Sequence, residues 1–174
     1  MASKQNKSLT ILAAPYNVVG PVNAATGALA ALPGRGHRVI FVVNQTFRGK
    51  LAAYGYEEHL IESVSRREEE KPGEVIARDL FASKVFGPYS PTEKLQNFIA
   101  FCKTSGNYAE IEVFERGLKE AIERYRPDLI YADCGVLWPS IYYSGIPWVR
   151  QVSCTPISYI VDDEASHPPA HSGK

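Results

Sequence analysis

Two apolar segments joined by one helical stretch limit the fold of the first 44 residues more than any other feature. Residues 8–14 have the length and continuous apolar character of a strand that is buried on both faces of a parallel sheet. Pro21 then opens a helical stretch that runs to residue 32, and residues 38–44 form a second apolar strand. A strand, a helix and a strand within about forty residues predict a βαβ unit with a right-handed crossover.

The same alternation continues along most of the chain. Further strands are expected at residues 56–62, 128–132 and 147–153, and further helices at residues 46–54, 74–84, 92–104, 108–125 and 136–143. From about residue 162 the sequence has no apolar face, so residues 162–174 are expected to form an extended or disordered tail. The predicted fold class is α/β, a Rossmann-like parallel sheet with helices on both faces, in one domain over residues 1–161.

Composition excludes several classes of function. Lys plus Arg equals Asp plus Glu, with 19 of each, whereas nucleic-acid and membrane-surface proteins need a basic excess. No apolar run approaches the ~20 residues of a membrane-spanning helix, and the polar start does not have the pattern of a signal peptide. The three cysteines, Cys102, Cys134 and Cys154, fit no metal-binding spacing. We therefore expect a cytoplasmic protein with reduced thiols and no bound metal.

Two loops that follow predicted strands carry polar residues. The first is residues 15–20, with Tyr16 and Asn17, and the second begins at Asp133 and Cys134. Ligands of open α/β sheets bind at the carboxyl ends of the strands. If the two strands are neighbours in the sheet, Asp133 and the helix start at Pro21 face one crevice.

Several short motifs, taken in order, resemble those of UDP-glycosyltransferases, enzymes of the GT-B fold. They are Ala-Pro-Tyr at 14–16, Val-Gly-Pro-Val-Asn at 19–23, Arg-Gly-His-Arg-Val at 35–39, Arg-Pro-Asp-Leu-Ile at 126–130, Ala-Asp at 132–133, and Ser-Gly-Ile-Pro-Trp-Val at 144–149. The resemblance covers nearly the whole chain. It is closest to the N-terminal, acceptor-side domain of the arthropod, mite-like branch of the family.

The resemblance implies a reaction and a set of roles. In this family a histidine after the loop glycine deprotonates the acceptor hydroxyl, and an aspartate after a later strand orients that histidine. The position after Gly20 holds Pro21, which has no titratable group, whereas the orienting carboxylate is present as Asp133. The resemblance also implies acceptor contacts, which we assign to Tyr16, Asn17, Gly20, Cys134 and Trp138.

The donor of this family is a UDP-sugar, which is held mainly by a C-terminal domain, and no tightly bound cofactor is implied. The sequence ends at Lys174 and does not include that donor-binding half. We therefore expect an acceptor-binding domain for small lipophilic molecules that, as this fragment, does not transfer sugar. The alternative is a non-catalytic small-molecule-binding protein derived from the family. A dinucleotide-binding domain is disfavoured, because no Gly-x-Gly-x-x-Gly pattern is present.

Each candidate residue also has a purely structural interpretation. An aspartate that ends a strand can cap the next helix, and a proline is common at a helix start. Cys134 could be a buried thiol and Trp138 a core residue. The histidines carry less weight. His37 lies at the far end of the first helical stretch, next to the incoming strand, and His59 is expected to be a surface or strand-edge residue. His167 and His171 flank two prolines that disfavour a metal-binding helix.

Overall fold

The structure is a computed structural model and describes residues 7–62, 72–104, 107–133 and 138–153. The chain divides into two compact units. The first contains residues 1–62 and 114–155, and the second contains residues 63–113 and 156–174. The predicted tail, Cys134, Cys154, His167 and His171 all lie outside the described residues.

A five-stranded parallel sheet forms the centre of the first unit, with the strand order β3-β2-β1-β4-β5. The strands are β1 (Thr10–Pro15), β2 (Arg38–Asn44), β3 (Glu57–Ile61), β4 (Leu129–Asp133) and β5 (Trp148–Gln151). The helices are α1 (Val19–Leu29), α2 (Pro72–Ala82), α3 (Pro91–Thr104), α4 (Asn107–Tyr125) and α5 (Pro139–Tyr142). The predicted α/β class and parallel Rossmann-like sheet are therefore confirmed.

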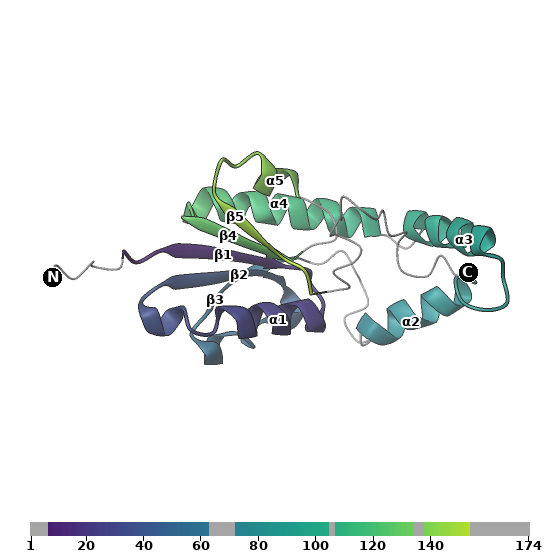
Figure 1. Cartoon of the computed structure of the whole chain (residues 1–174), viewed down its shortest axis with the longest axis horizontal. Helices are drawn as coiled ribbons and strands as arrows, with labels where there is room; N and C mark the ends of the chain where they lie inside the picture. Colours follow the sequence, from purple (N-terminus) through teal and green to yellow (C-terminus); the bar gives the residue numbers. More distant parts are fainter. Residues whose placement is uncertain (1–6, 63–71, 105–106, 134–137, 154–174) are drawn as a thin grey trace, which may run out of the picture. The chain divides into compact units, whose positions relative to one another are not determined.

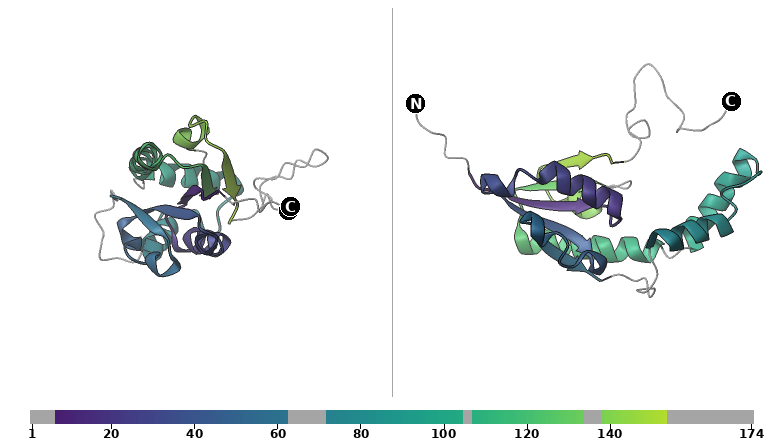
Figure 2. Two further views of the ribbon diagram at one scale, coloured as in Figure 1. Left: turned by 90° about the vertical axis from the view of Figure 1, so that its left-hand side faces the viewer. Right: turned by 90° about the horizontal axis from the view of Figure 1, so that it is seen from below.

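Helices cover both faces of the sheet, as the sequence predicted (Figures 1 and 2). Ile11 and Ala13 of β1 belong to one buried cluster with Val22 and Leu29 of α1. Because side chains alternate along a strand, the intervening residues face the other side, where α4 and α5 lie. Every β1 residue from Ile11 to Pro15 is buried, which explains the continuous apolar run in the sequence.

The start of α1 differs from the prediction. The helix begins at Val19, so Pro21 is its third residue and not its first. The first i to i−4 hydrogen bond runs from the Val22 amide to the Val18 carbonyl, at 3.2 Å. The N–H groups of the first turn have no partner within a helix, so a proline is tolerated there without losing a bond.

The predicted helix at 46–54 is wrong. The segment forms two separate 3₁₀ turns, η2 (Gln45–Phe47) and η3 (Ala52–Tyr54), with Gly49 between them at a φ of 73°. The Glu58 carboxylate of β3 accepts the N–H groups of Gly49 at 2.7 Å and Leu51 at 2.8 Å. These hydrogen bonds compete with helix formation, because they engage the backbone donors that a continuous helix would use.

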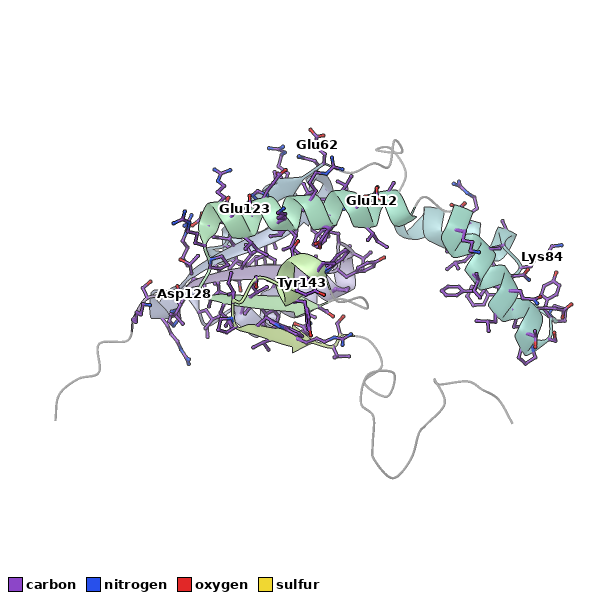
Figure 3. The ribbon with its side chains drawn as sticks, turned by 90° about the horizontal axis from the view of Figure 1, so that it is seen from above. Glu62, Lys84, Glu112, Glu123, Asp128 and Tyr143 are labelled. Carbon is purple, nitrogen blue, oxygen red and sulfur yellow. The ribbon has the colours of Figure 1, made fainter. Side chains whose placement is uncertain are left out.

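The amino end of β1 is held from both neighbouring strands. The Leu9 amide donates to Nδ1 of His37 at 3.2 Å, and the Thr10 amide donates to the Asp128 carboxylate at 2.9 Å. Figure 3 labels Asp128 at this end of the sheet. The Thr10 hydrogen bond lowers the pKa of Asp128, since it favours the charged carboxylate. His37 therefore has a structural role at the edge opposite the predicted site.

His59 lies on β3, the strand at one edge of the sheet, as expected for a strand-edge residue. Its half-buried ring meets the Tyr125 ring edge-on, with 5.6 Å between centroids. Burial and the neighbouring Arg124 charge lower the pKa of His59. Two strands, β2 and β1, separate it from β4, so it is not close to Asp133.

The second unit contains α2, α3 and the first residues of α4. A reciprocal capping box starts α3, in which the Ser90 amide donates to Glu93 at 2.8 Å and the Glu93 amide donates to the Ser90 hydroxyl at 3.3 Å. Several large apolar side chains of this unit are exposed, namely Phe81, Phe86, Leu95, Phe98 and Ile99. Among the helices of the described part of the chain, none is long and apolar enough to cross a membrane.

Gly117 provides a test of how closely α4 packs on the sheet. A Cβ at Gly117 would lie 2.6 Å from two side-chain carbons of Ile61, so Gly117→Ala should destabilise the fold by about 1–3 kcal/mol. The matched control is Gly27→Ala in α1, where a Cβ meets no described atom within 4 Å. That change should stabilise by about 0.5–1 kcal/mol, because alanine favours a helix interior. Urea unfolding measures both changes, and a neutral or stabilising Gly117→Ala would contradict the packing.

Candidate functional site

The two predicted loops are neighbours at the carboxyl edge of the sheet. β1 pairs with β4 in a register that places Pro15 opposite Asp133, the last residues of their strands. The next amide along the chain, that of Tyr16, donates to the Asp133 carbonyl at 2.7 Å. The condition set by the sequence, that the strands before the two loops lie side by side, is therefore met.

The Asp133 side chain is 6% exposed, which is unusual for a carboxylate. Its position in the register places it on the same face as Ile11 and Ala13, which is the face covered by α1. The side chain of Gln151 on β5 donates from Nε2 to Asp133 Oδ2 at 3.2 Å. The Ser153 amide lies 3.4 Å from Oδ1. Both groups are neutral donors, which suit a buried carboxylate because they satisfy its oxygens without requiring a second charge.

Tyr131 extends this polar group along β4. It lies two residues before Asp133, so both side chains are on one face, and its hydroxyl donates to Gln151 Oε1. Burial raises the pKa of the Tyr131 phenol, because it disfavours the charged phenolate. The nearby Asp133 charge raises this pKa further, because it repels a second anion. Tyr131, Gln151 and Asp133 thus form one hydrogen-bonded chain across β4 and β5.

The beginning of α1 supplies the other side of the candidate site. Tyr16 and Val19 are both more than half exposed, although they are large apolar residues. A Cβ added at Gly20 would meet no described atom within 4 Å, so the backbone borders open space there. Pro21 is partly buried and follows Gly20 directly in the first turn. This corner offers apolar surface and an accessible backbone.

Asn17 connects this loop to the neighbouring strand. Its side-chain oxygen accepts the Asn44 amide at 2.8 Å, at the end of β2. The Asn44 side chain in turn accepts the Thr46 amide at 3.1 Å, which caps η2. One function of Asn17 is therefore to fix the loop after β1, which leaves its proposed acceptor contact as a prediction.

Trp138 is not brought to Asp133. Its ring is 5% exposed and packs against Phe114 of α4, with 4.8 Å between centroids. The Asp133 side chain lies on the α1 face, whereas α4 lies on the opposite one. Trp138 therefore packs in the hydrophobic core, which is its structural interpretation. Cys134, the remaining proposed contact, lies outside the described residues.

The structural interpretation of Asp133 is that it caps the next helix, but the carboxylate of Glu115 caps the start of α5. The described hydrogen bonds of its carboxylate go to Gln151 and Ser153, whereas the Ser140 amide at the start of α5 donates to Glu115 at 2.7 Å. Within the described ranges, no group of three or more His, Cys, Asp or Glu side chains could hold a metal ion.

Sequence reasoning missed Gln151 and Tyr131. Both lie in segments expected to be strands, and a glutamine next to the carboxyl end of a strand was a signal for a polar partner. The identity of that partner depends on the register that places Gln151 opposite Asp133. A register between strands distant in sequence cannot be read from the sequence of either strand.

The coupling between Asp133 and Tyr131 can be measured by titration. Asp133→Asn removes the negative charge that raises the pKa of Tyr131, so that pKa should fall, while burial keeps it above the value of a free tyrosine. Nuclear magnetic resonance of ¹³Cζ-labelled tyrosine measures it, and Tyr131→Phe assigns the signal. An unchanged pKa in Asp133→Asn would show that the carboxylate does not act on the phenol.

No protein-family model matches the chain, and no curated protein matches it at a significant level. Solved structures do match. The calicheamicin glycosyltransferase CalG4 superposes with a TM-score of 0.51 at 21% identity, over 83% of this chain and 32% of its own. The glycotransferase of kitacinnamycin gives a TM-score of 0.52 at 17% identity, over 83% of this chain and 30% of its own.

A third structure, the glycosyltransferase SsfS6 of Streptomyces sp. SF2575, gives a TM-score of 0.55 at 18% identity, over 82% of this chain and 38% of its own. The chain spans about a third of the length of these glycosyltransferases. At these identities the likeness concerns the fold. The chain has the Rossmann-like fold of one part of GT-B glycosyltransferases.

Proposed function

We propose that this chain is the acceptor-binding domain of a UDP-sugar-dependent glycosyltransferase, which transfers a hexose to the hydroxyl of a small lipophilic acceptor. The observation that carries the proposal is the position of Asp133. It is a buried carboxylate at the carboxyl end of β4, directly beside the loop that leads from β1 into α1. The fold supports a glycosyltransferase domain, and the choice of UDP and of the mite-like branch depends on the sequence motifs.

In the proposed reaction the acceptor oxygen attacks the anomeric carbon of the sugar. The bond from that carbon to the UDP oxygen breaks, UDP leaves with the bonding electrons, and the acceptor proton passes to a general base. An imidazole at the position of Pro21 would take this proton, and Asp133 would orient it and stabilise its charged form. Proline can do neither, so Asp133 is left to accept a hydrogen bond from the acceptor hydroxyl.

The exposed apolar surface at the start of α1 supports a lipophilic acceptor. Tyr16 is 54% and Val19 65% exposed, next to the open backbone at Gly20. An apolar ligand that covers these side chains gains the free energy of removing their surface from water. The Asp133 carboxylate would then supply the polar contact that fixes the direction of the hydroxyl.

The second candidate function is binding without transfer, and Pro21 is the observation that favours it. A chain that keeps the oriented carboxylate but has no base can still hold an acceptor. The two candidates differ in whether a donor-binding domain acts together with this one. Translation of the reading frame beyond Lys174 distinguishes them directly.

The chain as given should not transfer glucose from UDP-glucose to a simple phenol. The position that the family resemblance assigns to the general base holds Pro21, which has no titratable group. The assay is chromatographic detection of the phenyl glucoside after prolonged incubation. Product above the control without protein would contradict the expectation.

The proposed pair of positions 21 and 133 can be tested in a graft of residues 1–156 onto the donor-binding half of an active relative. Pro21→His should raise the transfer rate by about 10²–10⁴-fold, the usual contribution of a general base. The gain should be small when Asp133 is replaced by alanine, because the imidazole then has no carboxylate to orient it.

The measurement is the transfer rate of all four combinations of this double-mutant cycle. Circular dichroism of each variant controls for folding, since replacing a first-turn proline can change stability. An equal gain from Pro21→His with and without Asp133 would show that the two positions do not act together.

A further inference from the structure

We propose that Gln151 is a positioning residue that, held in place by Tyr131, sets the orientation of the Asp133 carboxylate toward an acceptor. The inference rests on the proposed function, because it assigns a new residue to that site. Its structural basis, the chain of hydrogen bonds from β4 to β5 and back, can be tested without any acceptor or sugar.

The three side chains are brought together by the sheet itself. β4 and β5 pair in parallel, with Tyr131 opposite Val149 and Asp133 opposite Gln151. Residues opposite each other in register share a face, as do residues two apart on one strand. Tyr131, Asp133 and Gln151 therefore lie on the same face of the sheet, at its carboxyl edge.

The direction of the Gln151 amide follows from its two partners. Its carbonyl oxygen Oε1 can only accept, so the Tyr131 hydroxyl is the donor in their hydrogen bond. With Oε1 engaged, Nε2 faces Asp133 and donates to Oδ2 at 3.2 Å. A rotated amide would place Oε1 against the carboxylate, where two acceptors repel each other. Tyr131 thus holds Gln151 in the orientation in which it can donate.

This arrangement leaves a defined part of the carboxylate for a ligand. Oδ2 is engaged by Gln151, whereas the contact that the described residues make with Oδ1 is the long one of 3.4 Å from the Ser153 amide. A carboxylate oxygen can accept about two hydrogen bonds, so Oδ1 keeps the capacity to accept one from an acceptor hydroxyl. Because Gln151 is neutral, it orients the carboxylate without neutralising its charge.

The first test follows the side-chain amide of Gln151 by ¹H–¹⁵N nuclear magnetic resonance in the full chain, with the signal assigned by its loss in Gln151→Leu. Asp133→Asn and Tyr131→Phe should each shift this signal, because each removes one of its partners. Val149→Thr is the matched control, since Val149 lies on the same strand and face, and it should leave the signal in place. An amide signal unchanged in both Asp133→Asn and Tyr131→Phe would overturn the proposal.

The second test measures the affinity of 4-nitrophenol for the full chain by calorimetry. Gln151→Leu should weaken binding by about tenfold, as expected for a misplaced hydrogen bond to a charged group. In an Asp133→Asn background the same change should have little effect, because Gln151 acts through Asp133 and not on the ligand. Equal weakening in both backgrounds would show direct contact and would overturn the positioning role.

The two tests separate the inference from the proposed function. If 4-nitrophenol does not bind the unchanged chain, the proposed acceptor site loses its support, while the amide signal still decides whether Tyr131 and Gln151 hold Asp133. If the amide responds as expected and Gln151→Leu leaves the affinity unchanged, Gln151 does not position the carboxylate for binding, and the proposal fails.

Discussion

The pairing of β1 with β4 is the interaction on which the candidate site depends. β1 occupies the centre of the sheet and bonds to β2 on one side and β4 on the other. The β1–β4 register ends with Pro15 opposite Asp133, so the carboxylate and the loop into α1 are neighbours. A register slip of one residue would turn the Asp133 side chain to the α4 face, away from α1. The hydrophobic cores on the two faces therefore determine where the carboxylate points.

The two ends of β1 differ in the contacts that they make. At the amino end, His37 and Asp128 accept the amides of Leu9 and Thr10 and so fix the strand between its neighbours. Both belong to motifs that resemble a glycosyltransferase family, and the structure gives each of them a backbone partner. At the carboxyl end lie Asp133 and the open backbone at Gly20. A motif shared with a family can thus mark a requirement of the fold as well as one of chemistry.

The sequence was sufficient to predict the strands, because a strand that is buried on both faces consists mostly of consecutive apolar residues. The run before Pro15 and the run after His37 could be placed within two residues, since residues 11–14 and 39–43 are all apolar and buried. The segment at 46–54 was mistaken for a helix because its conformation depends on Glu58, a residue of the next strand. Gln151 was missed for the same reason, since its partners on β4 are 18 and 20 residues away. In both cases the conformation or the role of a residue depends on a contact with another element of the structure. The pattern of residues within one segment does not reveal such a contact.

The hydrogen-bonded chain across β4 and β5 affects how the proposed site would respond to the residue at position 21. A buried carboxylate that depended on an imidazolium for its charge balance would be destabilised by a proline there, because an uncompensated buried charge is costly. Asp133 instead has the neutral donors Gln151 and Ser153, which do not involve α1. The carboxylate can therefore stay ordered whether position 21 is a histidine or a proline. In the proposed site, acceptor binding and proton transfer would be separable properties: the sheet would determine the first, and one residue of the helix would determine the second.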